Sequence, residues 1–178
     1  MLIFINTMIA SKHLNLIPCN REILEGAIKG DKYLAQIINA EIADSWNGFG
    51  LQGIQYVLEK INSFPGQEVW WTYFPVIRKE NILIGNGGFK GAPDLNGYVE
   101  IGYEISPLYR NKGYATEMAK ALVDFAFANP FVLGVTAHTL GQENASTNVL
   151  TKCGFTLDKE IDDEEEGIIW RWKKTKAK

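Results

Sequence analysis

The chain has 178 residues, of which 46% are hydrophobic and 22% are charged, as in a single globular domain with a substantial core. The formal net charge of −3 gives no electrostatic reason to expect nucleic acid or an anionic membrane as a partner. The two cysteines, Cys19 and Cys153, show neither metal-ligand spacing nor a disulfide framework. We therefore expect one domain over residues 1–178, a cytoplasmic setting and no bound metal.

The opening MLIFINTMIA is apolar, but it lacks a basic leader and is far too short to span a bilayer. Residues 1–12 are therefore expected to add a leading strand or a flexible extension rather than a signal peptide. Alternating apolar residues predict the next strand from Leu14 to Ile17, and Pro18 ends it.

Helical patterns follow in the first third of the chain. Asn20 is a suitable N-cap for a helix that stops at Gly30, and Asp31 is a suitable cap for a second helix. Residues 43–53, which include three glycines, predict a loop. A further helix is expected from about Gly53 to Ile61.

Strand patterns dominate the rest of the chain. Runs rich in β-branched and aromatic residues predict a meander of antiparallel strands at 68–77, 82–84, 85–89 and 98–105. A strand at 132–139, reached through a helix, is expected to run parallel to 98–105 by a right-handed crossover. A short helix over 144–153 and a hairpin beginning at Phe155, with a solvated acidic turn at 160–166, complete the expected order.

The stretch Tyr98–Ala126 contains the features that point to chemistry. Its strand ends at Ser106-Pro107, and an amphipathic helix follows a loop that reads Arg110-Asn111-Lys112-Gly113-Tyr114-Ala115. A helix N-terminus offers unpaired N–H groups to a phosphate, and Gly113 would let the backbone approach it. Arg110 and Lys112 add positive charge. On this loop alone, an anion site and an ordinary basic turn fit equally well.

The sequence RNKGYA resembles the (Gln/Arg)-x-x-Gly-x-(Gly/Ala) loop of the GCN5-related N-acetyltransferases, the GNAT family, which bind acetyl-CoA. The longer stretches EIGYEISPLYRNKGYATE and ENASTNVLTKCGF are similar to the branch that contains the ribosomal-protein N-terminal acetyltransferases. The resemblance runs from about Leu14 to Trp172. It implies the GNAT acyl-CoA N-acyltransferase fold, a mixed α/β (α+β) fold. Its central, twisted sheet is mostly antiparallel, contains one parallel, splayed strand pair, and is flanked by helices.

The same resemblance implies a set of residues that bind acetyl-CoA. The pyrophosphate would lie on the loop, and the pantetheine arm would lie between the splayed strands. Asn144 and Ser146 resemble the family's Asn…Ser pair, although they stand two rather than three positions apart, and the alternative is that they cap the helix. The implied residues are Ile105, Leu108, Arg110, Asn111, Lys112, Gly113, Tyr114, Ala115, Asn144 and Ser146.

Acetyl transfer to an amine requires removal of a proton, because most amines are protonated near neutral pH. Glu100 and Glu104 share one face of the 98–105 strand, and either could accept that proton. Glu100 matches the acidic position of the family's Glu-Ile-Gly-Tyr pattern and is the first candidate, with Glu104 as the second. The alternative for Glu100 is a strand glutamate that only pairs with a cation. His138 is a further candidate, set against a structural role at the end of its strand.

We therefore expect an acetyl-CoA-dependent N-acetyltransferase in which an amine attacks directly within a ternary complex. The acceptor is either a protein N-terminus or a small-molecule amine. The family places its early helices beside the acceptor, so Trp46, Phe49 and Tyr56 either line that cleft or simply cover the core. A homodimer is expected only by analogy with the family. The alternative function is a non-catalytic module that binds or senses acyl-CoA.

Overall fold

The protein is described by a computed structural model that covers residues 8–177, and residues 1–7 of the expected N-terminal extension lie outside the described part. The first half contains three helices and six short strands. The second half contains two helices and four longer strands. In chain order the elements are β1 (Ile9–Ala10), β2 (Leu14–Pro18), α1 (Arg21–Lys29), α2 (Asp31–Ile38), β3 (Glu41–Ile42), α3 (Gly50–Ser63), β4 (Thr72–Ile77), β5 (Ile82–Leu83), β6 (Gly85–Phe89), β7 (Tyr98–Ile105), α4 (Tyr114–Ala128), β8 (Gly134–Leu140), α5 (Ala145–Lys152), β9 (Thr156–Asp163) and β10 (Gly167–Thr175).

One sheet runs through the molecule in the order β1-β2-β4-β6-β7-β8-β10-β9, and β3 and β5 pair beside it. Neighbours along this path are antiparallel except β7 and β8, which are parallel. The two-residue pairing of β3 with β5 is also parallel. The expected mixed fold is therefore confirmed, including the crossover from β7 through α4 to β8.

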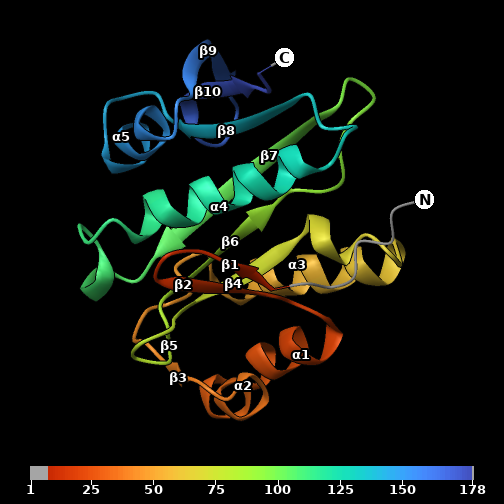
Figure 1. Cartoon of the computed structure of the whole chain (residues 1–178), viewed down its shortest axis with the longest axis vertical. Coiled ribbons are helices and arrows are strands. Elements are labelled where there is room, and N and C mark those ends of the chain that lie inside the picture. Colours follow the sequence, from red (N-terminus) through yellow and green to blue (C-terminus); the bar gives the residue numbers. More distant parts are fainter. Residues whose placement is uncertain (1–7, 178) are drawn as a thin grey trace.

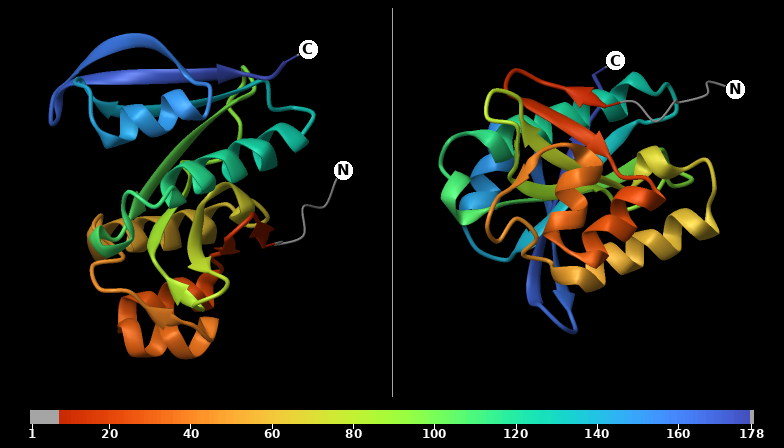
Figure 2. Two further views of the ribbon diagram at one scale, coloured as in Figure 1. Left: turned by 60° about the vertical axis from the view of Figure 1, so that its left-hand side comes forward. Right: turned by 90° about the horizontal axis from the view of Figure 1, so that it is seen from below.

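Helices cover both faces of the sheet. Figure 1 shows α4 crossing the front of the strands, and the left view of Figure 2 places α5 and the β9–β10 hairpin at the opposite end from α1 and α2. Side chains of β4 alternate between the two faces of the sheet. Tyr73 and Ile77 belong to the core on the α4 side, whereas Phe74 and Val76 belong to the core on the α1–α3 side.

Several element boundaries differ from the sequence-based expectations. The expected loop over 43–53 is shorter, because α3 begins at Gly50, where a positive φ of 74° turns the chain into the helix. Only the second half of the 68–77 run is a strand, and Glu68–Trp70 forms a 3₁₀ turn that directs Trp70 into the core. Asp31 is the first residue of α2 rather than its cap, and its carboxylate accepts a hydrogen bond from Trp46 Nε1 at 3.0 Å.

The parallel pair β7–β8 opens along its length. Ladder partners run only from Tyr98–Gly134 to Glu100–Thr136, although β7 continues to Ile105 and β8 to Leu140. Beyond Glu100 the two strands diverge, so side chains of both line a gap in the middle of the sheet. This divergence positions the candidate site.

No helix in residues 8–177 is long and apolar enough to cross a membrane. Among the same residues, no group of three or more His, Cys, Asp and Glu side chains is placed to hold a metal ion.

Candidate active site

Two pockets lie beside the opening between β7 and β8. The first, here called the loop pocket, has a volume of about 880 Å³ and lies between the loop at residues 109–116 and the start of α5. The second, called the sheet pocket, has a volume of about 800 Å³ and is lined by both diverging strands, α5 and the β9–β10 hairpin. Tyr103 and Ile105, two positions apart on β7, line the sheet pocket and the loop pocket respectively. The two pockets therefore lie next to each other along the open strand pair.

The loop pocket contains the N-terminus of α4. Gly113 is the N-cap, with φ 86°, and no side chain caps the helix there. A Cβ added at Gly113 would meet no atom within 4 Å, so the space in front of the helix is open. The first N–H groups of a helix have no partner within it, and they favour an anion. The geometry is that of a phosphate cradle.

Most of the expected acetyl-CoA-binding residues line the loop pocket, but three do not. Leu108 is 67% exposed and lies outside the lining. Lys112 also lies outside it, and its Nζ sits 4.9 Å from the centroid of the Tyr109 ring. Ser146 lines the sheet pocket instead. The expected residues that do line the loop pocket are Ile105, Arg110, Asn111, Gly113, Tyr114, Ala115 and Asn144.

Asn144 caps α5. Its Oδ1 accepts hydrogen bonds from the backbone N–H of Ser146 at 2.8 Å and of Thr147 at 3.1 Å. Thr147 Oγ1 accepts from Asn144 N at 3.0 Å, which completes a capping box. Asn144 Nδ2 donates to Gln142 O at 3.0 Å, so both ends of the amide are engaged within the protein. Of the two roles considered for Asn144, the structure contains the capping role.

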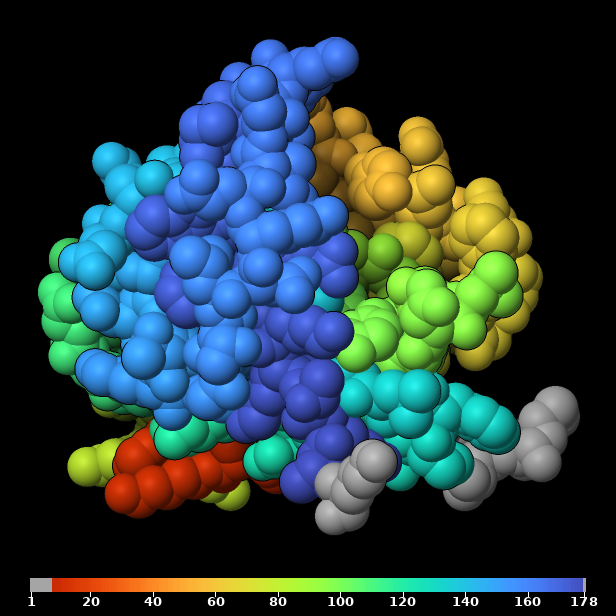
Figure 3. Space-filling model, turned by 90° about the horizontal axis from the view of Figure 1, so that it is seen from above, coloured from red at the N-terminus to blue at the C-terminus, as the bar shows by residue number. Residues whose placement is uncertain are grey.

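The sheet pocket lies on the face shown in Figure 3, where the blue β9–β10 hairpin stands beside the orange segment around α3 and the green segment that precedes β7. Phe49, which is 60% exposed, contributes to its lining. The other two aromatic candidates do not, because Trp46 is buried at 4.9 Å from the Phe74 ring and Tyr56 packs near Trp71.

Glu100 lies on the wall of the sheet pocket and contacts a lysine and a histidine. Its Oε1 is 3.0 Å from His138 Nδ1 and also contacts Lys90 Nζ. Burial raises the pKa of Glu100, but the hydrogen bonds and charges of Lys90 and His138 outweigh it and hold the pKa below its ordinary value. Glu100 is therefore ionised at neutral pH.

Glu104 occupies the other end of the pocket and holds a loop. Its Oε1 accepts a hydrogen bond from the backbone N–H of Phe49 at 3.1 Å. Burial raises the pKa of Glu104, although hydrogen bonds from the Phe49 and Gly48 backbone and the charge of Arg110 oppose it. Glu100 and Glu104 thus share one pocket, as the alternation of β7 predicts, but they have different partners.

Four ionisable residues of the pocket were not among the expected site residues: Lys90, Tyr103, Asp163 and Glu166. The Tyr103 hydroxyl donates to Ser146 O at 3.5 Å, and burial raises its pKa. Lys90 follows the end of β6, Asp163 ends β9 and Glu166 lies in the turn between β9 and β10, and their position over β7 depends on the tertiary fold. Asp163 and Glu166 belong to the acidic segment 160–166, which the sequence pattern assigned to a solvated turn, and Tyr103 lies within the EIGY stretch that carried the resemblance.

Comparison with known proteins identifies the class. Residues 36–156 match the family model of the acetyltransferase (GNAT) domain, which is more than half of the chain. The protein is an N-acetyltransferase and belongs to the GNAT family. Over 156 residues it is 30% identical to the Bacillus subtilis protein described as uncharacterized N-acetyltransferase YjdG, a match that covers 85% of this chain and 90% of the relative.

Solved structures share the fold at low sequence identity. The ribosomal-protein-S5-alanine acetyltransferase from Vibrio fischeri superposes with a TM-score of 0.68 at 14% identity, covering 95% of this chain and 96% of that chain. The microcin C7 self-immunity acetyltransferase MccE, solved in complex with acetyl-CoA and AMP, has a TM-score of 0.65 at 15% identity, covering 92% and 93%.

Proposed function

We propose that this enzyme transfers an acetyl group from acetyl-CoA to a primary amine by direct attack of the amine within a ternary complex. Acetyl-CoA would occupy the loop pocket and the amine would occupy the sheet pocket. The observation that carries the proposal is that these two pockets are lined by neighbouring residues of β7 and α5 where β7 and β8 diverge. A thioester that enters from one side can be reached there by an amine that enters from the other.

The residues of the loop pocket suit the donor. The open space before Gly113 accommodates a pyrophosphate on the N–H groups of α4, and Arg110 adds positive charge beside it. The pantetheine arm would run past Ile105 towards Ser146. Binding of acetyl-CoA to the MccE structure, which shares this fold, supports the assignment. Acetyl-CoA supplies the activated acyl group, and no metal is required for this chemistry.

The open strand pair suits the acyl transfer itself. The carbonyl oxygen gains charge as the amine attacks, and backbone N–H groups stabilise such charge. Beyond Glu100 the ladder between β7 and β8 ends, so N–H groups of β7 on that side are not used by β8. The leaving thiol has an ordinary pKa of about 8.5, so its departure as a thiolate needs little assistance. Groups around Glu100 in the sheet pocket would remove the proton from the amine.

The charges of the sheet pocket favour an amine that arrives protonated. Four carboxylates line it, those of Glu100, Glu104, Asp163 and Glu166, against the single permanent cation Lys90. Such a lining attracts positively charged ligands. Both a protein N-terminus and a small-molecule amine meet this requirement, and a volume of about 800 Å³ accepts either a small amine or the first residues of a peptide.

Thermal melting with and without acetyl-CoA tests the donor site. A ligand that binds only the folded state raises the melting temperature by mass action. We expect a shift in the wild type that vanishes in Gly113→Trp, whose indole would fill the open space. Gly113→Ala is the matched control, because it carries the same strain at positive φ with far less bulk and should retain the shift. The absence of a shift in the wild type at saturating acetyl-CoA would overturn the proposal.

Amine-dependent release of CoA separates an enzyme from a binding module. The screen would offer amino-terminal peptides and small diamines in parallel, with CoA thiol detected by a chromogenic disulfide. We expect CoA release that requires an amine. A wild type that binds acetyl-CoA but releases no CoA with any acceptor would instead support the non-catalytic acyl-CoA-binding module.

A further inference from the structure

The gap between β7 and β8 is bridged by a glutamate and a histidine. Glu100 projects from β7 and His138 from β8, with 3.0 Å between Oε1 and Nδ1. Their side chains are 26% and 25% exposed, and both line the sheet pocket. The pair is therefore partly removed from solvent and still accessible to a ligand in that pocket.

The contact defines which imidazole nitrogen is free. Glu100 is ionised, because Lys90 and His138 hold its pKa low, and a carboxylate can only accept hydrogen bonds. A hydrogen on Nδ1 of His138 is therefore favoured beside Oε1 of Glu100 at 3.0 Å, as an ion-pair contact without hydrogen-bond geometry. In the neutral ring, Nε2 is then the nitrogen with the lone pair.

Two carboxylates of the pocket already have partners within the protein. Oε1 of Glu100 is shared by Lys90 and His138. Oε1 of Glu104 accepts the Phe49 N–H and fixes the loop. The lowered pKa of Glu100 makes its carboxylate a weak proton acceptor near neutral pH, whereas a neutral imidazole nitrogen is suited to accept a proton in that range.

The charged groups around His138 come from every neighbouring element. Glu100 faces it from β7 and Lys90 from the end of β6. Arg171 stands opposite His138 in the register with β10, where its Nε is 3.3 Å from Asp158 Oδ2. Asp163 lies close enough for the charge of His138 to help lower its pKa, after the hydrogen bonds from the Glu166 and Glu165 backbone. The His138 ring therefore has both positively and negatively charged side chains around it.

We propose that His138 accepts the proton of the attacking amine and that Glu100 acts through it as a positioning residue; this rests on the acetyltransferase function proposed above. An amine that enters protonated first releases one proton to solvent. The neutral amine nitrogen then forms a bond to the thioester carbonyl carbon, and the carbon–sulfur bond breaks. The sulfur leaves with the bonding electron pair as the CoA thiolate. The proton lost by the nitrogen goes to His138 Nε2, and the resulting imidazolium is stabilised by the Glu100 carboxylate.

The pH profile distinguishes this role from a structural one. The acid limb of kcat/KM reports the essential base of the free enzyme. A histidine base places that limb between about pH 5 and 8, whereas a carboxylate base with a lowered pKa places it below this range. Glu100→Gln removes the charge that stabilises the imidazolium, so the acid limb should move to lower pH.

The experiment measures kcat/KM against pH for the wild type, His138→Gln, Glu100→Gln and His13→Gln. The matched control is the only other histidine of the chain, and its Nδ1 likewise contacts a glutamate, Glu117, at 2.8 Å far from the pocket. We expect His138→Gln to lower kcat/KM by about 100-fold or more and to abolish the acid limb. Glu100→Gln should lower it by about 10-fold with the acid limb displaced, and His13→Gln should match the wild type.

Some outcomes would overturn the role of His138. Activity of His138→Gln within about threefold of the wild type, with the same acid limb, would exclude it as the proton acceptor. Abolition of activity in Glu100→Gln alone would make Glu100 the direct base. The acetyl-CoA thermal shift of each variant shows whether a loss of rate reflects a loss of folding or of donor binding.

A measurement that does not depend on activity separates this inference from the proposed function. Nitrogen NMR of the imidazole in the His13→Gln background observes His138 alone. We expect the Nδ1-protonated tautomer, and its titration should move to lower pH when Glu100→Gln is added. An Nε2-protonated ring would overturn the inference even in an inactive protein, whereas an inactive wild type with the expected tautomer would overturn only the acetyltransferase proposal.

Discussion

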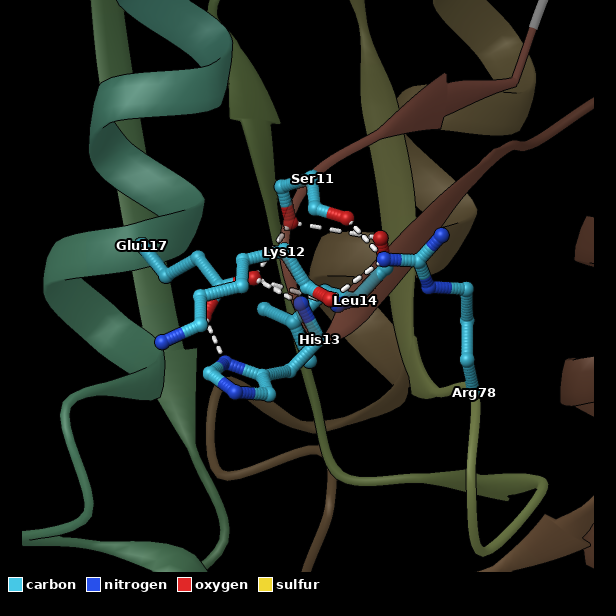
Figure 4. A network of polar contacts seen from close by, with 6 residues as sticks. All are labelled: Ser11, Lys12, His13, Leu14, Arg78 and Glu117. Atoms are coloured by element: carbon cyan, nitrogen blue, oxygen red, sulfur yellow. Dashed lines mark hydrogen bonds and ion pairs between the residues drawn. The ribbon is translucent and has the colours of Figure 1, made fainter.

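At the scale of single residues, Glu117 shows how one carboxylate fixes a turn to a helix. It projects from α4 and accepts hydrogen bonds from Ser11 Oγ at 2.6 Å and from His13 N at 2.5 Å (Figure 4). His13 Nδ1 lies 2.8 Å from its second oxygen. Arg78 binds the carbonyl oxygens of Ser11 and Lys12 on the other side of the same turn. The β1–β2 turn is thus held from two directions.

Glu117→Gln is expected to destabilise the protein in a pH-dependent way. Burial raises the pKa of Glu117, but hydrogen bonds from Ser11, His13 and Leu14 outweigh it and lower the pKa. A lowered pKa stabilises the fold above the unfolded value of about 4.3, and this stabilisation is lost as pH falls through the folded value. The substitution should cost about 1–2 kcal/mol at pH 7, or roughly 2–8 °C in melting temperature.

Melting curves from pH 7 down to pH 3 check this expectation. The difference between the wild type and Glu117→Gln should shrink as the pH falls. Glu59→Gln, at an exposed position of α3, is the control and should change the melting temperature little at any pH. A Glu117→Gln difference that stays constant with pH would show that the ionised carboxylate does not stabilise the turn.

The residue scale also marks the limit of what the sequence alone predicts. Gly113 at positive φ and Asn144 at a helix start are local requirements, so their residue types identify them. The contact of Glu100 with His138 is not local, because it depends on how far apart β7 and β8 lie. The sequence therefore offered Glu100 and His138 as separate candidates, and only the fold brings them to 3.0 Å.

At the scale of elements, substitutions at the start of α5 distinguish two roles of Asn144: capping the helix and contacting acetyl-CoA. Asn144→Ala removes the acceptor for Ser146 N and Thr147 N and should cost about 1 kcal/mol of stability. Asn144→Ser keeps a good N-cap and should stay within about 0.5 kcal/mol of the wild type. If capping is the main role, Asn144→Ser should also keep the acetyl-CoA thermal shift.

Chemical denaturation of both variants, followed by melting with acetyl-CoA, measures the two effects. A stable Asn144→Ser protein that has lost the acetyl-CoA shift would show that the amide contacts the donor directly. In that case the resemblance to the family's Asn…Ser pair would describe Asn144 better than its capping box does.

The loop at residues 44–49 is a second element whose position matters for the site. It is held to β6 and β7 by three contacts: Ser106 Oγ donates to Asp44 O at 2.7 Å, Asn86 Nδ2 to Asn47 Oδ1 at 3.4 Å, and Phe49 N to Glu104 Oε1 at 3.1 Å. Ser106 is 1% exposed. Because Phe49 lines the sheet pocket, these contacts set one wall of the proposed acceptor site.

Ser106→Ala is therefore expected to affect the acceptor more than the donor. Loss of a buried hydrogen bond costs about 1 kcal/mol, which should loosen the loop and raise the KM for the amine about fivefold. The KM for acetyl-CoA should change less than twofold. Steady-state kinetics with each substrate varied in turn measure both, and Ser63→Ala, which removes an exposed hydroxyl bond to Glu59 O in α3, is the control. Equal effects on the two KM values would contradict this assignment of the loop.

Most helices and strands could be predicted from the sequence, but their first and last residues could not. Period-two and period-3.6 patterns identified β2, β7, β8, α1 and α4 because each buries one continuous face. The two-residue strands β3 and β5 have no such period. They form where two loops pass each other, as in the pairing of Glu41 with Ile82 and of Ile42 with Leu83.

At the scale of the whole molecule, two hydrophobic cores lie on opposite faces of one sheet. Met118 of α4 is fully buried in the first core, and Leu34 of α2 is fully buried in the second. Strand β4 contributes Tyr73 to the first core and Phe74 to the second. Since successive residues of one strand belong to different cores, neither core can lose its packing without disturbing the backbone of the other.

The protein is therefore expected to unfold as a single cooperative domain. Met118→Ala and Leu34→Ala should each lower stability by about 2–5 kcal/mol, and each should leave one transition. Circular dichroism and tryptophan fluorescence should coincide in both variants, because tryptophans lie in both cores: Trp70 and Trp172 in the first, Trp46 and Trp71 in the second. A Leu34→Ala protein with two separate transitions would show that the α1–α3 half folds on its own. The sheet pocket lies where Phe49 from that half meets β7 and β8, so cooperative unfolding would also mean that acceptor site and donor site are lost together.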